Sequence, residues 1–202
     1  VAIRAVGQAL RQFRYGRGDR TRARKELDLP EEGVVVSVLP GSWRERDTPI
    51  AAVVEEALNR TGRPWTMVWV AGDDTAELQA RFAGVPQVRV IESDWQMDRL
   101  MAASTFAVTK ANRKTCLELA ALGIPFLSFF FGNNAVDERR VATLARSRAV
   151  GGGEASAEDV GRAIEELLAL PDAVEVDARM DGAAQAAEAI AGWLAPPGDG
   201  EP

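Results

Sequence analysis

The stretch "TFAVTKANRKTCLELAALGIPFLSFFF" (residues 105–131) decides the fold that the sequence predicts. It opens with an apolar run at 105–110, passes through a polar turn into a helical pattern at 113–123, and ends in a second apolar run at 124–131. Apolar runs of this length without alternation are typical of strands buried on both faces of a parallel sheet. The stretch therefore predicts one strand–helix–strand unit.

The same alternation continues in both directions along the chain. Further strands are expected at 33–40, 64–72 and 86–93, and further helices at 20–29, 48–62, 73–84, 94–104, 135–148 and 157–170, with an Ala-rich helix ending near Trp193. Single helices between strands indicate βαβ units and hence a parallel sheet. We therefore expect an α/β fold with a doubly wound, Rossmann-like parallel sheet.

Composition narrows the classes of function. The chain has 202 residues, 47% of them hydrophobic and 27% charged, as in an ordinary globular domain. Its net charge of −6 argues against nucleic acid as a partner. One cysteine and no histidine exclude an intrachain disulfide and remove the commonest general base and metal ligand. We expect no metal and no cofactor, and, without a signal peptide or an apolar run of membrane-spanning length, a cytoplasmic location.

The turn between the two apolar runs has the residues of an anion site. In an open parallel sheet, ligands bind outside the carboxyl ends of the strands, so strand-to-helix loops are where binding residues are expected. Asn112 can adopt a left-handed turn, and the amides at 112–115 lie near a helix N-terminus, which favours anions. Arg113 and Lys114 strengthen that field, and the Thr115 hydroxyl can donate to a phosphate.

Glu118 lies one helical turn beyond Thr115, on the same side of the expected helix. Its carboxylate would repel a phosphate, but its two oxygens can accept hydrogen bonds from the two hydroxyls of a neighbouring ribose. Both residues are also ordinary choices for the start of a helix, since early acids suit the helix dipole.

The loop "LPGSWRERDTP" (39–49) is a second candidate. Gly41 allows backbone to approach a ligand closely, Ser42 offers a hydroxyl, and Arg44 and Arg46 offer cationic forks, a combination that suits a diphosphate. A turn with solvated arginines explains the same residues equally well.

Two more loops complete the set. In "FFFGNNAVDE" (129–138), the amides of Asn133 and Asn134, with Asp137 and Glu138, could bind sugar hydroxyls, whereas Asn134 taken alone is a good helix cap.

In "VIESDWQMDRL" (90–100), backbone near Ile91 and Glu92 could bind a base edge, with Met97 or Trp95 against the face of the base. Core packing of the following helix explains Met97 equally well.

These motifs, taken in order, resemble a known family. A polar turn, then T-x-x-E-L-A-A-L-G-x-P (115–125), an apolar strand and a helix with Asp137-Glu138 resemble the C-terminal domain of GT-B glycosyltransferases, above all the family that includes the peptidoglycan N-acetylglucosaminyltransferase acting on lipid I. "LPGSWRE" (39–45) is similar to a stretch of lipid A disaccharide synthase. The resemblance covers roughly residues 30–170.

The resemblance implies a role for each matching residue. In that family the C-terminal domain binds the nucleotide sugar, usually a UDP-sugar, and the N-terminal domain binds the acceptor. Carried over, Glu118 would hold the ribose, and Thr115 with nearby amides would hold the diphosphate. The remaining matches are Gly41 and Ser42 for a first diphosphate loop, Ile91 for the base, and Asn133, Asn134, Asp137 and Glu138 for the donor sugar. The turn "KANRK" replaces a glycine-rich one, and Glu138-Arg139-Arg140 stands where glutamines usually follow an acid.

We therefore expect the donor-binding domain of a metal-independent glycosyltransferase that moves a sugar to an acceptor hydroxyl. Residues 1–20 would be an interdomain linker or the remnant of a missing N-terminal acceptor domain, 21–195 the nucleotide-sugar-binding domain, and 196–202 a disordered tail. The catalytic base and any membrane contact would belong to the missing domain, so the domain alone would be inactive. The alternatives are a nucleotide-sugar hydrolase or 2-epimerase domain, and a non-catalytic α/β interaction domain.

Overall fold

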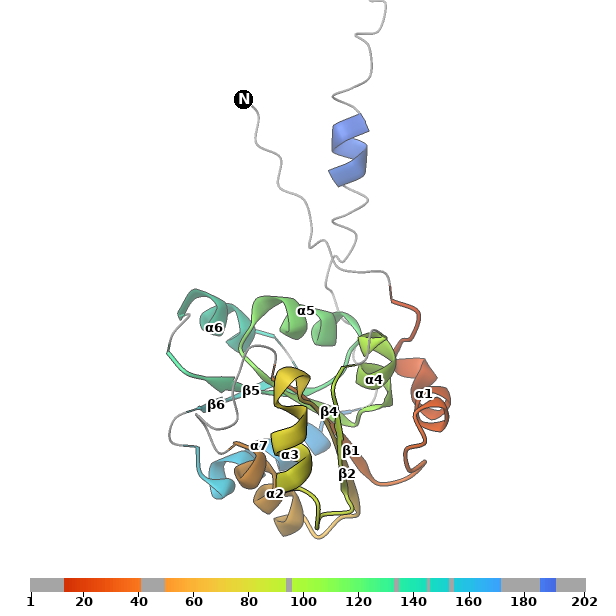
Figure 1. The fold of residues 1–202 in the computed structure, drawn as a ribbon. Helices are drawn as coiled ribbons and strands as arrows, with labels where there is room; N and C mark the ends of the chain where they lie inside the picture. Colours follow the sequence, from red (N-terminus) through yellow and green to blue (C-terminus); the bar gives the residue numbers. More distant parts are fainter. Residues whose placement is uncertain are drawn as a thin grey trace, which may run out of the picture. The chain divides into compact units, whose positions relative to one another are not determined.

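Six strands in a computed structural model of the chain form one parallel sheet, in the order β3-β2-β1-β4-β5-β6. Helices lie on both sides of this sheet (Figure 1). The structure describes residues 13–40, 50–93, 96–132, 135–144, 146–152, 155–171 and 186–191. The strands are β1 (Val34–Leu39), β2 (Trp65–Val70), β3 (Val88–Ile91), β4 (Phe106–Lys110), β5 (Phe126–Phe130) and β6 (Ser147–Gly151). The predicted doubly wound parallel α/β sheet is confirmed.

The helices of this sheet are α1 (Arg20–Glu26), α2 (Ile50–Arg60), α3 (Thr75–Arg81), α4 (Met97–Ala103), α5 (Arg113–Ala121), α6 (Ala135–Ala142) and α7 (Ala157–Leu168). Short 3-10 turns, η1 (Arg17–Asp19) and η3 (Gly72–Asp74), precede α1 and α3. Residues 13–176 belong to one compact unit, Phe13–Val176. A second unit consists of Val1–Gln12 and Asp177–Pro202, in which residues 186–191 are helical, within the Ala-rich region where a helix is expected.

One predicted element is wrong. The expected helix at 135–148 ends at Ala142, and residues 147–151 form the sixth strand, β6, instead. This strand ends the strand order and pairs only with β5 in the sheet as described. From Arg148 to Gly151 its residues alternate between partly buried and exposed positions. It therefore lacks the continuous apolar run that marks a strand buried on both faces.

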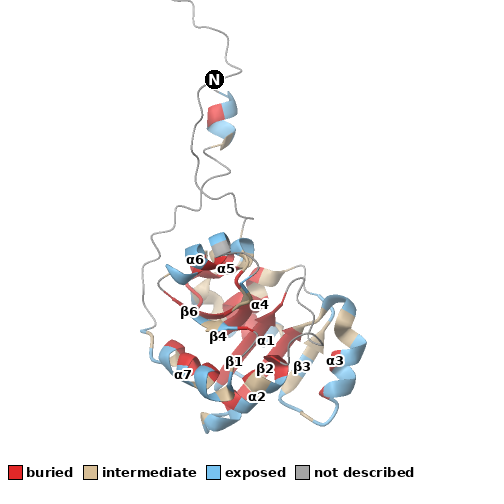
Figure 2. Ribbon diagram, turned by 90° about the vertical axis from the view of Figure 1, so that its left-hand side faces the viewer, coloured by how far each residue is buried: buried red, intermediate tan, exposed pale blue. Residues whose placement is uncertain are grey.

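The apolar run in β1 fills both faces of the sheet, because all six of its residues are buried (Figure 2). Val36 and Val38 lie in a core that α2, α3 and α7 complete, and Val35 and Leu39 lie in a second core with α4 and α5. Alternate side chains of a strand point to opposite faces, so the valines and the leucine of this strand supply both cores, although Ser37 stands among them. Full burial of one such side chain contributes roughly 2 kcal/mol.

The order of the strands places a reversal between β1 and β4. The chain runs outward from β1 through β2 to β3, then returns to the other side of β1 and continues from β4 to β6. The two strands meet in register at their carboxyl ends, where Leu39 is opposite Thr109 and the Thr109 hydroxyl donates to the Leu39 carbonyl at 2.9 Å. This reversal is the point of an open α/β sheet at which ligands usually bind.

At the opposite edge of the sheet, the buried Arg24 joins four segments. Its guanidinium donates to the carbonyls of Ala103 (2.9 Å) and Glu31 (2.7 Å) and to the hydroxyl of Thr105 (3.0 Å), which in turn accepts the amide of Val35 (3.0 Å). Burial lowers the pKa of the Arg24 guanidinium, and the charge of Arg20 adds to the effect. The reach of arginine satisfies backbone carbonyls that would otherwise be enclosed without a donor.

Alanine variants of two glycines test the packing at the start of β1. Gly33 has φ +87°, and a Cβ there would lie 2.9 Å from the Pro64 carbonyl oxygen, the acceptor of the Val34 amide. Gly62 has φ +64° and open space around it. Both alanine variants bear the left-handed strain of about 1–2 kcal/mol, and only Gly33→Ala adds a clash, so we expect losses of about 3 and about 1 kcal/mol respectively. Urea unfolding measures both, and equal losses would contradict the packing described.

Candidate functional site

The predicted site residues fall only partly within the described ranges. Eight of them belong to the part of the chain that the structure describes in full, namely Ile91, Met97, Asn112, Arg113, Lys114, Thr115, Glu118 and Glu138. Gly41, Ser42, Arg44, Asn133 and Asn134 lie outside the described residues, as do Arg46 and Trp95, and for Asp137 only the backbone, in α6, is described. Their assignments stay predictions.

The N-terminus of α5 lies directly at the β1–β4 reversal. Asn112 does not have the left-handed conformation expected of it; its backbone is extended (φ −98°, ψ 134°), and its side-chain oxygen caps the helix by accepting the Thr115 amide at 2.9 Å. An extended backbone is the usual conformation of a helix N-cap, and the short asparagine side chain reaches the third amide. The cap leaves the amides of Arg113 and Lys114 as the first-turn donors that an anion would meet.

The side chains of this first turn differ in exposure. Arg113 and Lys114 are exposed, and Thr115 is half-buried. Glu118, one turn further along, is only 2% exposed and has an interaction partner within the chain. A pentose that bound to its carboxylate would therefore have to displace what covers it.

The carboxylate of Glu138 holds the loop after β5. It is 9% exposed, and its Oε1 accepts the backbone amides of Phe131 and Gly132, both at 2.9 Å. Gly132 has φ +72°, a conformation that favours glycine at this turn. One oxygen of the residue that the sequence assigns to the donor sugar is thus occupied in shaping the loop.

Ile91 and Met97 pack inside the domain. The Ile91 carbonyl accepts the Ala71 amide at 2.8 Å, which directs the backbone of that residue toward β2 rather than out of the sheet. Both side chains are partly buried against the core that α4 and α5 share. The packing of Met97 supports the structural alternative for that residue, and a contact of Ile91 or Met97 with a base stays a prediction.

Sequence reasoning missed Asp98, which is 5% exposed in the first turn of α4. Its Oδ2 accepts the backbone amides of Arg14 (2.6 Å) and Tyr15 (3.1 Å). The only local signal is an acid in the first turn of a helix, which is common for dipole reasons alone.

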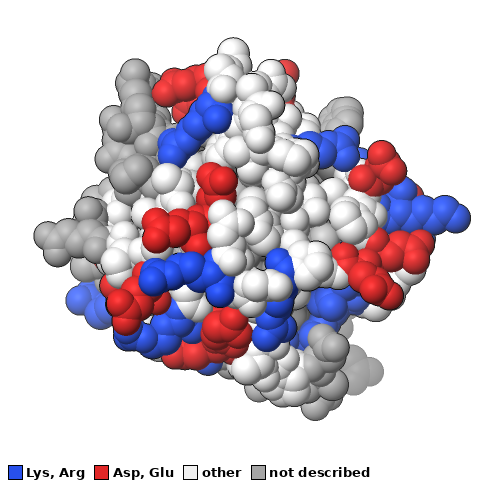
Figure 3. Space-filling view, turned by 90° about the horizontal axis from the view of Figure 1, so that it is seen from below, with Lys and Arg blue, Asp and Glu red and all other residues white. Residues whose placement is uncertain are grey.

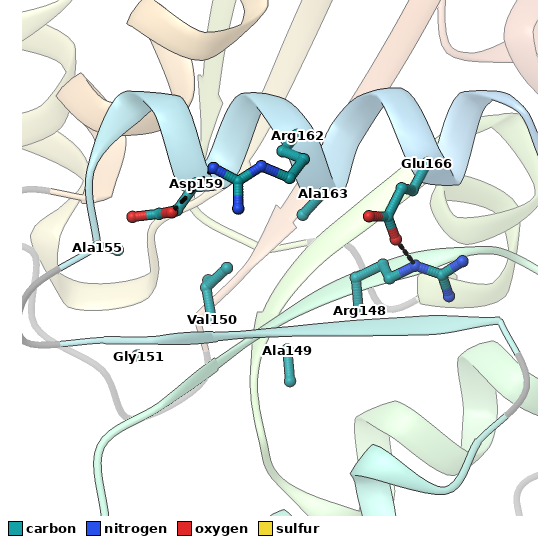
Figure 4. A pocket seen from close by; sticks show the side chains of 9 residues that line it. All are labelled: Arg148, Ala149, Val150, Gly151, Ala155, Asp159, Arg162, Ala163 and Glu166. Atoms are coloured by element: carbon teal, nitrogen blue, oxygen red, sulfur yellow. Dashed lines mark hydrogen bonds and ion pairs between the residues drawn. The ribbon is translucent and has the colours of Figure 1, made fainter.

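A cavity of about 370 Å³ lies elsewhere, between β6 and α7 (Figure 4). Arg148 and Val150 point from β6 toward α7, whereas Ala149 points to the other side of the strand. Arg148 is paired with Glu166, and Arg162 lies 3.7 Å from the Asp159 carboxylate. None of the residues that line this cavity is among the predicted site residues.

Charges of both signs also alternate on the face that carries α2 and α7 (Figure 3). Pairs there include Arg63 with Glu165 at 3.4 Å and Arg162 with Glu158 at 3.7 Å. Such a mixed face does not form the single-sign field that attracts a polyanion.

In the part of the chain that the structure describes, no set of three or more His, Cys, Asp or Glu side chains is placed to hold a metal ion. No helix in the same ranges is both long enough and apolar enough to cross a bilayer.

Comparison with known structures identifies the fold. MurG of Acinetobacter baumannii matches at a TM-score of 0.65 with 13% identity, over 84% of this chain and 52% of that one. The E. coli ADP-heptose LPS heptosyltransferase II matches at 0.58 with 16% identity, over 78% and 53%. The chain has the fold of a GT-B C-terminal domain.

A third matching structure was solved with a bound nucleotide. Os79 from O. sativa, solved in complex with UDP, matches at a TM-score of 0.51 with 19% identity, over 67% of this chain and 32% of that one. The chain spans between about a third and about half of the length of the glycosyltransferases that it matches. No protein-family model and no curated protein sequence matches it. At such identities the likeness establishes the fold alone.

Two substitutions of Glu138 test whether its carboxylate stabilises the loop after β5. Glu138→Ala leaves the amides of Phe131 and Gly132 without their acceptor, and we expect a loss of about 2–3 kcal/mol in the free energy of unfolding. Glu138→Gln keeps an acceptor oxygen and should lose about 1 kcal/mol.

Glu158→Ala, on the exposed face of α7, is the control and should change little. Urea unfolding compares the three variants. If the alanine and glutamine variants of Glu138 were equally stable, the hydrogen bonds to the loop would not be what fixes it.

Proposed function

We propose that this chain is the donor-binding domain of a metal-independent GT-B glycosyltransferase, and that its donor is a UDP-sugar. The fold supports a sugar-transferase domain. The nucleotide, the donor role and the residues that bind it are the parts that go beyond the fold.

The position and the charge of the α5 N-terminus are the main support for this proposal. The N-terminus of α5 lies at the carboxyl end of β4, at the β1–β4 reversal, and two exposed cations, Arg113 and Lys114, occupy its first two positions. Helix amides and the helix dipole favour an anion there, and the cations add charge-assisted hydrogen bonds. The half-buried Thr115 hydroxyl is a third donor in the same turn.

This arrangement suits the leaving group of sugar transfer. An acceptor oxygen forms a bond to the anomeric carbon, the bond from that carbon to the diphosphate oxygen breaks, and the acceptor proton passes to a base. Negative charge grows on the diphosphate as the bond breaks, and the α5 amides with Arg113 and Lys114 would stabilise it. The acceptor site and the base would come from a second domain, so this domain alone should not transfer sugar.

The remaining contacts of the proposed site surround the diphosphate. Glu118 would accept from the ribose hydroxyls once the pentose replaces what covers it, and Ile91 with Met97 would border the base. The other proposed contacts are Gly41, Ser42 and Arg44 for the diphosphate, and Asn133, Asn134, Asp137 and Glu138, through its second oxygen, for the sugar.

A charge-matched pair of double variants tests the diphosphate site. Arg113→Ala with Lys114→Ala should weaken UDP binding at least about tenfold, because charge-assisted hydrogen bonds to the phosphates are lost. Arg139→Ala with Arg140→Ala removes the same charge from exposed positions of α6 and should leave the affinity within about twofold. Isothermal titration with UDP measures both.

If both double variants bound UDP equally weakly, the loss of affinity would come from the change in net charge, and the proposed diphosphate site would be contradicted. A wild-type chain that binds no nucleotide would favour the non-catalytic interaction domain. Release of free sugar, or of an epimer, from a UDP-sugar without an acceptor would favour the hydrolase or 2-epimerase.

The Glu118→Gln variant tests whether Glu118 contacts the ribose and not the phosphates. The neutral amide is a weaker acceptor for the two hydroxyls, so UDP affinity should fall about tenfold while the affinity for inorganic pyrophosphate stays unchanged. Parallel titrations with the two ligands check this, and an equal loss for both would show that Glu118 acts on the fold of α5 instead.

A further inference from the structure

The segment that enters the α/β unit, residues 13–16, is held against two helices; we name it the N-terminal strap. Asp98, buried in the first turn of α4, accepts the amides of Arg14 and Tyr15 through one carboxylate oxygen, at 2.6 and 3.1 Å. These are hydrogen bonds between groups 84 and 83 residues apart in the sequence. A buried carboxylate with two backbone donors is a strong, charge-assisted attachment.

The strap is also attached to α1 through side chains. The Tyr15 hydroxyl donates to Glu26 at 2.5 Å, and the Arg22 guanidinium lies 4.6 Å from the centre of the Tyr15 ring. The Gly16 amide donates to the Asp19 carboxylate at 2.9 Å. The strap thus has a fixed position on α1 that does not depend on Asp98.

The N-cap residue of α4 is Gln96, and its side chain makes no capping hydrogen bond. The Gln96 carbonyl accepts the amides of Arg99 (2.9 Å) and Leu100 (3.4 Å) within the first turn. The first turn is the part of a helix that frays most readily. The bonds from Asp98 to the strap attach this turn to a second element of the fold.

That turn lies at the edge of the sheet where the candidate site is. It follows the carboxyl end of β3, and its first residue is Met97. Met97, Ile91, Phe13 and Tyr15 all pack against the same core. The strap, the turn and the proposed base-side residues therefore all pack against one hydrophobic cluster.

We propose that Asp98 is a positioning residue: by fastening the first turn of α4 to the N-terminal strap, it sets the wall against which the base of the nucleotide binds. The inference rests on the proposed function for its ligand. It assigns Asp98 no contact with the nucleotide, and it leaves the diphosphate site at α5 untouched.

Two variants of the full chain and one control test this role. Asp98→Asn keeps the shape and an acceptor oxygen but removes the charge, and Asp98→Ala removes the attachment. Asp159→Asn is the control, because Asp159 is an exposed acid in the first turn of α7. Hydrogen exchange by NMR follows the amides of Arg14, Tyr15, Arg99 and Leu100, and titrations with UDP and with inorganic pyrophosphate follow binding.

We expect exchange at all four amides to accelerate at least tenfold in Asp98→Ala and less in Asp98→Asn, with no change in Asp159→Asn. UDP affinity should fall at least threefold in Asp98→Ala while pyrophosphate affinity stays constant, a split that general destabilisation would not produce. Faster exchange in the strap alone, unchanged UDP affinity, or equal loss for both ligands would overturn the inference. A wild-type chain that binds neither ligand would overturn the proposed function and this role together, whatever the exchange rates.

Discussion

The pairing of β1 with β4 is the constraint on which the rest of the structure depends. The chain leaves β1 in one direction, returns to its other side, and so places strand ends from the two halves of the sheet next to each other. The Thr109 hydroxyl joins the two ends by its bond to the Leu39 carbonyl. The N-terminus of α5 can meet a ligand at this point only because β4 is seated between β1 and β5.

Buried polar side chains then fix the loops around that sheet. Asn112 caps α5, and Glu138 accepts hydrogen bonds from two backbone amides after β5. Asp98 accepts hydrogen bonds from two backbone amides of the N-terminal strap. Arg24 donates to backbone carbonyls at the opposite edge. Each of these side chains satisfies backbone groups that would be costly to enclose alone. Loops held in this way are preorganised, which favours a stable fold and fixed loop positions around the sheet.

The sequence was sufficient for the sheet because its interior strands are mainly apolar without polar–apolar alternation, as in β1 and β5, which each contain a single serine. It was insufficient for β6, an outer strand whose covered and exposed positions alternate, and whose residues were assigned in part to a helix. In the site, the anion-favouring start of α5 was predictable from Arg113 and Lys114, which follow a strand directly. The cap geometry of Asn112, the anchoring by Glu138 and the contact of Asp98 with the strap depend on distant backbone groups, and residue type alone does not reveal them.

We propose that the first turn of α5 binds the diphosphate of a nucleotide, and a UDP titration followed by the backbone amide signals in ¹H–¹⁵N NMR spectra tests this site. We expect the Arg113 and Lys114 amides to shift most and to saturate with one affinity. Largest shifts at Ala149, Gly151 and Arg162, in the cavity between β6 and α7, with unchanged α5 amides, would show that UDP binds elsewhere.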